Sequence, residues 1–181
     1  IALSLHPPQS MTGACRVLVA EDDPALQQEY RLAFAAGTPA EGATNFRSLE
    51  SDLFGGANPA GIAGSEMSSE LTGCAQGEEA VRAMQTAVDA GRAYSVAFID
   101  VRMPPGIDGI TAAERMIEID GTLNAVIVTG YSDIPRQEIH RRLGKSNLFY
   151  FQKPFLGDEF MQLAWALPRK REAERQLQGS I

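Results

Sequence analysis

Short apolar runs alternate with amphipathic helical patterns along most of this chain. The runs are rich in β-branched residues, as is typical of strands buried on both faces of a parallel sheet. Four runs are clear, and the second of the five is weaker and rests mainly on the helical pattern that follows it. The five runs cover residues 17–20, 71–75, 96–99, 125–128 and 148–151. This alternation predicts an α/β fold with a parallel sheet covered by helices.

Apolar residues recur at helical spacing in five segments between and after these runs. The first helix is predicted to begin at Pro24, which suits the first helical position, with Asp23 as its N-cap. The remaining helices are expected at about 78–90, at about 110–119, from about 135 and from 158. Because Pro168 has no backbone N–H, we expect the last helix to kink or restart there.

Residues 38–70 do not fit this alternation, because they are rich in Gly, Ala and Ser. We interpret them as an insertion between the first helix and the second strand. The alternating part predicts one domain over residues 15–167, preceded by an N-terminal extension over 1–14. The segment 168–181 is highly charged, favours a helix and has few apolar anchors, so we expect a linker toward another, missing domain.

Composition and charge exclude several classes of function. At 181 residues and 44% hydrophobic, the chain can form a domain with its own core. Its net charge of −7 argues against direct binding of nucleic acid, which requires a basic surface. Cys15 and Cys74 lie in no motif for a disulfide framework or a zinc site. The apolar stretches are far shorter than the roughly 18 residues of a membrane span, so we expect a cytoplasmic protein.

Polar residues that could carry chemistry follow the predicted strands directly. They are Glu21, Asp22 and Asp23 after the first strand, Asp100 at the end of the third, Thr129 at the end of the fourth and Lys153 beyond the fifth. The carboxyl ends of parallel strands form the usual ligand edge of such a sheet. Carboxylates gathered there need a cation, and a set of oxygen ligands selects magnesium, manganese or calcium. Thr129 and Lys153 would complete a site for a phosphoryl group.

Four segments around these residues resemble the receiver domain of two-component response regulators. They are residues 17–24, 98–109, 126–132 and 150–155. Each motif alone is weak, but all four occur in the right order at the right strand ends. The resemblance covers residues 15–167 apart from the insertion. It implies a doubly wound (βα)5, flavodoxin-like three-layer sandwich with a five-stranded parallel sheet in the order 2-1-3-4-5.

The resemblance also implies which residues would hold the metal and the phosphoryl group. Asp100 would be the phosphoacceptor. Asp22, Asp100 and the backbone carbonyl of Arg102 would ligate Mg²⁺, and Glu21 would act through water. Lys153 would pair with the phosphoryl oxygens, and no organic cofactor is implied.

By the same resemblance, two residues would form the switch. Thr129 would move to bond the phosphoryl group, and Tyr150 would follow it inward. The face made by the fourth helix, the fifth strand and the fifth helix would then be read by a partner. The Lys153-Pro154 peptide bond is expected to be cis.

The partners implied are a sensor histidine kinase and a fused or separate output domain. The insertion looks like that of receivers fused to sensor kinases or to cyclic-dinucleotide enzymes. A homodimer is also compatible with the resemblance, whereas an enzyme beyond self-catalysed phosphotransfer and dephosphorylation is not expected.

Two other functions stay open on the sequence alone. One is a receiver that serves as a docking scaffold without accepting phosphate. The other is a magnesium-dependent phosphatase with an aspartyl-phosphate intermediate. Such phosphatases usually carry a second aspartate two residues beyond the nucleophile, where this chain has Arg102.

Overall fold

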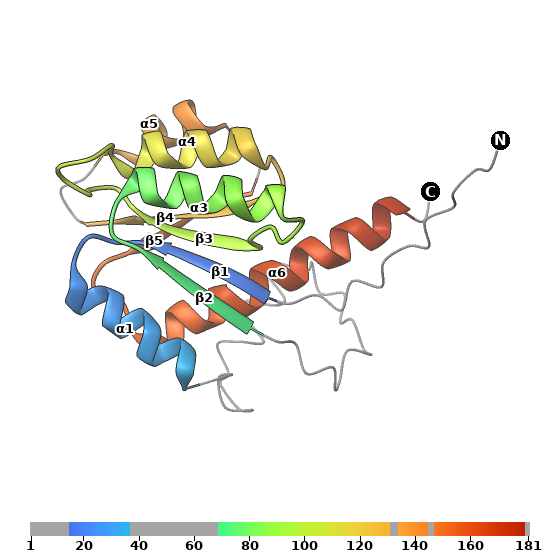
Figure 1. The fold of residues 1–181 in the computed structure, drawn as a ribbon, viewed down its shortest axis with the longest axis horizontal. Helices are drawn as coiled ribbons and strands as arrows, with labels where there is room; N and C mark the ends of the chain where they lie inside the picture. Colours follow the sequence, from blue (N-terminus) through green and yellow to red (C-terminus); the bar gives the residue numbers. More distant parts are fainter. Residues whose placement is uncertain (1–14, 37–68, 131–133, 145–146, 180–181) are drawn as a thin grey trace.

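The structure is a computed structural model in which part of the chain is described. The described residues are 15–36, 69–130, 134–144 and 147–179 (Figure 1). The predicted N-terminal extension and nearly all of the predicted insertion at 38–70 therefore lie outside the described residues. The boundaries of the domain, the insertion and the linker stay predictions.

Five parallel strands form one sheet in the order β2-β1-β3-β4-β5. The strands are β1 (Cys15–Ala20), β2 (Ser69–Cys74), β3 (Val96–Asp100), β4 (Asn124–Thr129) and β5 (Leu148–Gln152). Each predicted run coincides with one of them, although the weak second run extends one residue beyond β2, which ends at Cys74. The predicted strand order is confirmed.

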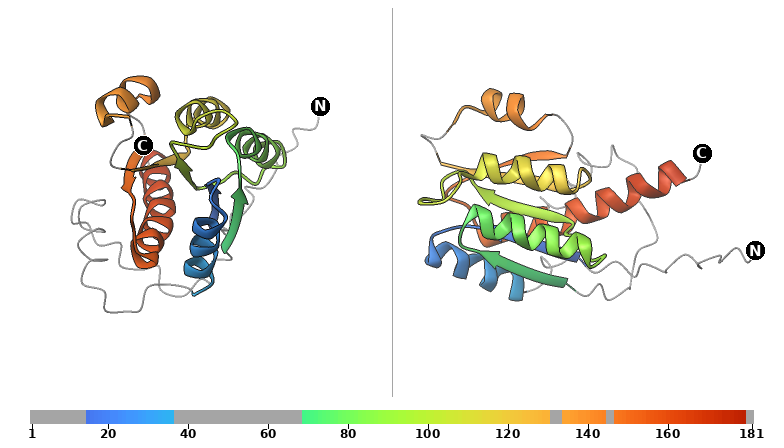
Figure 2. Two further views of the ribbon diagram at one scale, coloured as in Figure 1. Left: turned by 90° about the vertical axis from the view of Figure 1, so that its left-hand side faces the viewer. Right: turned by 45° about the horizontal axis from the view of Figure 1, so that its top comes forward.

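Helices cover both faces of this sheet and give a three-layer architecture (Figures 1 and 2). The helices are α1 (Pro24–Ala35), α3 (Gly77–Asp89), α4 (Gly109–Ile119), α5 (Arg136–Leu143) and α6 (Gly157–Gly179). Helices α3, α4 and α5 lie on one face, and α1 and α6 lie on the other. This is the doubly wound α/β arrangement that the sequence predicts.

Alternation along the buried strands divides the core between the two faces. In β1, Leu18 faces a cluster that includes Met84 of α3, while Val17 and Val19 face a second cluster that includes Phe160 of α6. Because successive side chains of a strand point to opposite faces, a strand covered on both sides is apolar throughout. This is why the strands read as continuous apolar runs.

The predicted start of α1 is confirmed. Pro24 is its first residue, and the Asp23 side chain accepts a hydrogen bond from the backbone N–H of Ala25 at 2.8 Å. Such an N-cap satisfies one of the amide groups that have no partner within the helix. Asp23 thus has a structural role, as we expected.

Of the two outcomes predicted at Pro168, a kink or a restart, the restart is wrong, because α6 continues through Pro168 to Gly179. A proline in a helix leaves the carbonyl four residues earlier without its usual donor. Here that carbonyl belongs to Ala164, and the buried thiol of Cys15 donates to it at 3.5 Å. A side chain of β1 thus compensates for the missing N–H.

The part of α6 beyond Pro168 is attached to the end of the domain opposite the strands' carboxyl ends. Arg171 donates to the backbone carbonyl of Tyr94 at 3.1 Å and to the hydroxyl of Thr122. It also forms an ion pair with Asp120 at 3.5 Å. These contacts fix the direction in which α6 leaves the sheet.

In the part of the chain that the structure describes, no helix combines the length and apolar character needed to cross a membrane. Cys15 and Cys74 are both free and buried. Both therefore serve as small residues of the core.

Candidate functional site

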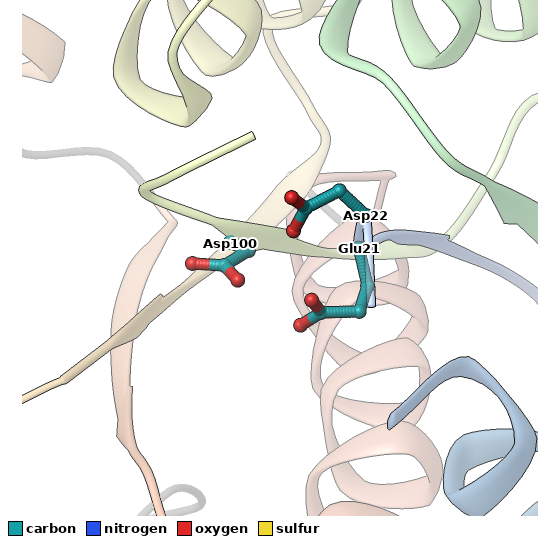
Figure 3. A group of neighbouring side chains, drawn as sticks. All are labelled: Glu21, Asp22 and Asp100. Carbon is teal, nitrogen blue, oxygen red and sulfur yellow. The ribbon is translucent and has the colours of Figure 1, made fainter. Parts of the chain in front are cut away.

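Three carboxylates meet where β1 and β3 end. Glu21 and Asp22 follow β1 directly, and Asp100 is the last residue of β3, the strand next to β1. One carboxylate oxygen from each residue lies within 4.8 Å of those of the other two. Figure 3 shows the two side chains that follow β1 beside Asp100. Glu21 and Asp100 are buried, and Asp22 is partly exposed.

Lys153 brings a positive charge to this cluster. Its ammonium group donates to Asp100 Oδ2 at 2.6 Å and to Glu21 Oε2 at 2.9 Å. The backbone N–H of Lys153 donates to the carbonyl of Thr129 at 2.9 Å, which holds this residue beside the end of β4. The following Lys153-Pro154 bond is cis, as expected.

The electrostatics of the cluster are dominated by burial and excess negative charge. Burial raises the pKa of Glu21, with a smaller contribution from the nearby charge of Asp100, and hydrogen bonds from Lys153 and the Asp23 amide lower it. The net effect is a pKa raised to about 7. Partial burial lowers the pKa of Lys153, but its hydrogen bonds to Asp100 and Glu21 prevail and raise it above its usual value. One ammonium group is thus paired with two of the three carboxyl groups.

This donor set fits a magnesium ion. It consists of carboxylate oxygens, which hard divalent cations prefer, and its negative charge exceeds that of its single ammonium partner. Among the residues that the structure describes, this is the only such group of three potential ligands. The structure brings together the three carboxylates predicted from the sequence, and the backbone carbonyl of Arg102 stays a predicted ligand.

The loop from Val101 to Asp108 leaves Asp100 and returns to it. At its start, the backbone N–H of Arg102 donates to Asp100 Oδ1 at 3.0 Å. At its end, the N–H of Gly109 donates to the carbonyl of Val101 at 2.9 Å. A Cβ atom on Gly109 would lie 1.8 Å from the carbonyl oxygen of Asp100, so only glycine permits this approach. The loop is thus closed tightly beside the central carboxylate.

The two predicted switch residues lie in different surroundings. Thr129 ends β4 and is 9% exposed, next to the position that pairs with Asp100. The hydroxyl of Tyr150 instead donates to the carbonyl of Arg136 at 3.3 Å and lies 3.3 Å from Nδ1 of His140. Tyr150 therefore contacts α5 and is not part of the acidic cluster.

A surface hollow is also found beside Tyr150. It has a volume of about 650 Å³ and is lined by residues of α5 together with Gly144 and Tyr150. None of the residues that line it belongs to the acidic cluster.

Sequence reasoning missed two side chains that reach the loop after β3. Gln76 and Glu78 at the start of α3 hydrogen-bond to its backbone. Glu78 was assigned only to the start of a helix, and no signal in the sequence joined it to residues 104–107. Their contacts depend on the folded path of the loop.

No protein-family model and no curated protein matches this sequence. The fold, however, is found in solved structures. A CheY-like response regulator receiver domain protein from Methanospirillum hungatei JF-1 is 15% identical, with a TM-score of 0.60, and the match covers 90% of this chain and 99% of that chain. A protein described as adenylate cyclase from Rhodopirellula baltica is 18% identical, with a TM-score of 0.61, over 92% of this chain and 96% of that one.

A third similar structure is the receiver domain of a sensor histidine kinase from Pseudomonas aeruginosa PAO1. It is 19% identical, with a TM-score of 0.55, over 87% of this chain and 99% of that one, and it has a magnesium ion coordinated in the active site cleft. The chain therefore has the fold of response regulator receiver domains. The predicted resemblance is confirmed at the level of the fold.

Proposed function

We propose that this chain is a phosphoacceptor receiver domain of a two-component system. The observation that carries the proposal is the position of Asp100, whose carboxylate lies beside the acidic pair Glu21 and Asp22 and is paired with the ammonium group of Lys153. The fold supports it, because this site lies at the carboxyl ends of the strands, where open α/β sheets bind ligands.

In the proposed reaction, a carboxylate oxygen of Asp100 attacks the phosphorus atom of a phosphohistidine on a sensor histidine kinase. The new oxygen–phosphorus bond forms as the phosphorus–nitrogen bond breaks, and the imidazole leaves with the electron pair of that bond. Lys153 would neutralise charge on the transferred oxygens. The loop closure at Gly109 would hold the nucleophile in place, since this reaction depends mainly on positioning and electrostatics.

Magnesium is the cofactor that we propose for this site. Asp22, Asp100 and the backbone carbonyl of Arg102 would hold the ion, and Glu21 would contact it through water. When bound, Mg²⁺ would supply positive charge to the phosphoryl oxygens. Without it, the three carboxyl groups and the single lysine would leave an incoming anion facing net negative charge.

Phosphorylation would act as a switch through Thr129 and Tyr150. The new phosphoryl oxygens beside the end of β4 would draw the hydroxyl of Thr129 toward them. Tyr150 would then leave its contacts with Arg136 and His140 and move inward. This would change the face made by α5, β5 and α6, which corresponds to the readout face expected from the sequence.

The proposed partners are a sensor histidine kinase and an output domain, either fused or separate. Similar structures include one described as an adenylate cyclase and one from a sensor histidine kinase, which makes a cyclase, a cyclic-dinucleotide enzyme or a kinase a reasonable class of output. Direct nucleic-acid binding is not proposed. In this function the chain is a cytoplasmic signalling domain whose only chemistry is gaining and losing the phosphoryl group.

The test is phosphorylation of the full chain by acetyl phosphate with Mg²⁺, read by intact mass. We expect one phosphoryl group on the wild type, and none on Asp100→Asn or after chelation of the metal. Asp89→Asn, the same change at an exposed aspartate of α3, is the matched control and should be phosphorylated normally. Beryllofluoride with Mg²⁺ should also change the fluorescence of Trp165.

Absence of both responses would reject the proposal and favour a scaffold that does not accept phosphate. Rapid turnover of acetyl phosphate without a stable phosphorylated form would instead favour the phosphatase. The presence of Arg102 two residues after Asp100 argues against the phosphatase.

A further inference from the structure

The loop over residues 101–108 is held beside Asp100, where its two ends meet, and also at residues 104–107, away from Asp100. Gln76, just before α3, bonds to it twice. Its Nε2 donates to the carbonyl of Pro104 at 3.2 Å, and its Oε1 accepts from the backbone N–H of Gly106 at 3.2 Å. Glu78 adds a third bond, because its Oε1 accepts from the N–H of Ile107 at 3.0 Å.

These three bonds serve backbone groups that no helix or strand satisfies. Residues 101–108 contain neither kind of element, so the loop lacks the regular hydrogen bonds that would otherwise fix its path. Gln76 pairs with the loop much as a neighbouring peptide group would, with one donor and one acceptor. Side chains at the start of α3 thus supply hydrogen bonds that a neighbouring strand would otherwise give to the backbone of the loop.

The packing at this contact is close. A Cβ atom on Gly106 would lie 2.4 Å from Glu78 Oε2 and 2.8 Å from Gln76 Oε1. A side chain at position 106 would displace the ends of these two side chains from the loop. Ile107, next along the loop, packs against the core cluster on the same face of the sheet as α3 and α4. Residues 104–107 are therefore held by hydrogen bonds and by packing.

We infer that Gln76 and Glu78 are positioning residues for the metal site. The inference rests on the proposed function, in which the carbonyl of Arg102 ligates Mg²⁺. A backbone ligand has no side-chain rotamer with which to adjust, so the path of its loop decides where its oxygen lies. The closure at Gly109 fixes both ends of the loop beside Asp100. The contacts with Gln76 and Glu78 fix residues 104–107, which lie between those ends.

The test uses the full chain and Mn²⁺, which shares the preference of Mg²⁺ for oxygen ligands and whose free concentration can be followed by electron paramagnetic resonance. Glu78→Ala removes the acceptor for the Ile107 amide, and Glu78→Gln retains an oxygen at that place. Partners that orient metal ligands typically contribute 10–100-fold to affinity, so we expect about tenfold weaker Mn²⁺ binding in Glu78→Ala. Glu78→Gln should bind within about twofold of the wild type.

Hydrogen exchange of the Gly106 and Ile107 amides gives a second readout that needs no metal. Exchange should be faster in Glu78→Ala at Ile107, and near the wild-type rate in Glu78→Gln. Gln85→Ala, at an exposed position of α3 whose side chain bonds only to Asp89 of the same helix, is the control and should change neither readout. If Glu78→Ala does not fold, Gln76→Ala tests the same contact from the other side chain.

The outcomes separate this inference from the proposed function. If Glu78→Ala exchanges faster at Ile107 but binds Mn²⁺ as the wild type does, the contact is only structural and the inference is wrong. Equal weakening in the Gln and Ala variants would also overturn it, because charge and not the hydrogen bond would then be responsible. Failure of the wild type itself to bind Mn²⁺ would overturn the proposed metal site, and the inference with it.

Discussion

Replacing Gly109 with alanine should disrupt the site more than any other single methyl group we could add near it. The new Cβ would lie 1.8 Å from the carbonyl oxygen of Asp100, 2.6 Å from the carbonyl carbon and 3.0 Å from the Cα of Val101. All three are backbone atoms at the end of β3, so no flexible side chain can move away. Relief therefore requires the loop and the start of α4 to shift by roughly 1 Å.

The expected cost follows from that shift. Overpacking of a well-packed site typically costs about 1–3 kcal/mol, and contact with rigid backbone places this case near about 3 kcal/mol. Lower chain entropy in the unfolded state returns about 0.4–1 kcal/mol for a change from glycine to alanine. At about 2–4 °C per kcal/mol for a domain of this size, the melting temperature should fall by roughly 5–8 °C. Because a misplacement of 1 Å can cost about 100-fold in rate, phosphorylation by acetyl phosphate should slow by a comparable factor.

Gly121→Ala is the matched control, because it adds the same methyl group just beyond the other end of α4. The nearest atom to its Cβ would be the carbonyl oxygen of Ile117 at 3.9 Å, which is an ordinary contact. Its stability should stay within about 0.5 kcal/mol of the wild type. Thermal unfolding and the rate of phosphorylation would be measured for both variants. If Gly109→Ala melted and reacted like Gly121→Ala, the tight closure of the loop beside Asp100 would be refuted.

Two further predictions concern charge and the C-terminal helix. Because the pKa of Glu21 is raised from 4.5 to about 7 in the folded protein, this group contributes stability that is complete below pH 4.5 and is lost as the pH rises through about 7. In the presence of a chelator, the loss of stability should approach about 3 kcal/mol. Urea unfolding should therefore show the stability of Glu21→Gln rising relative to that of the wild type between pH 5 and pH 8. A difference in stability that stayed constant over this range would contradict the prediction. Arg171→Ala should lower the stability of the protein by about 1 kcal/mol and speed amide exchange in α6 beyond Pro168, without changing phosphorylation. The control is Arg115→Ala, at an exposed position of α4. Unchanged exchange in Arg171→Ala would show that Arg171 does not hold the helix.

Much of the fold can be predicted from local sequence patterns, because burial determines which residue types a strand or helix can carry. Strands buried on both faces must be apolar throughout, and helices that cover them must carry an apolar stripe, so β1, β3 and β4 stand out as runs. The polar residues that follow such runs then gather at one edge of the sheet, since all strands are parallel. This geometry brings Glu21, Asp22 and Asp100 together as predicted from their positions alone.

The features that could not be predicted depend on contacts between distant segments. The continuity of α6 at Pro168 requires a donor for the carbonyl of Ala164, and that donor is a thiol near the other end of the described chain. The orientation of Tyr150 depends on where α5 places Arg136 and His140. A sequence pattern can predict that a backbone group will lack its usual hydrogen-bond partner. It does not indicate which distant group takes that partner's place.

The rigidity of the site and its electrostatics are linked. Crowded carboxylates on flexible loops could separate and so reduce their repulsion, but the closure at Gly109 and the buried position of Glu21 prevent this. The excess charge can then be neutralised only by a proton, by a cation or by both. With Lys153 already shared between Glu21 and Asp100, a proton on Glu21 and a bound metal ion become alternatives for the same charge. Metal affinity should therefore increase as the pH rises through about 7, the pKa of Glu21, and this dependence should be weaker in Glu21→Gln.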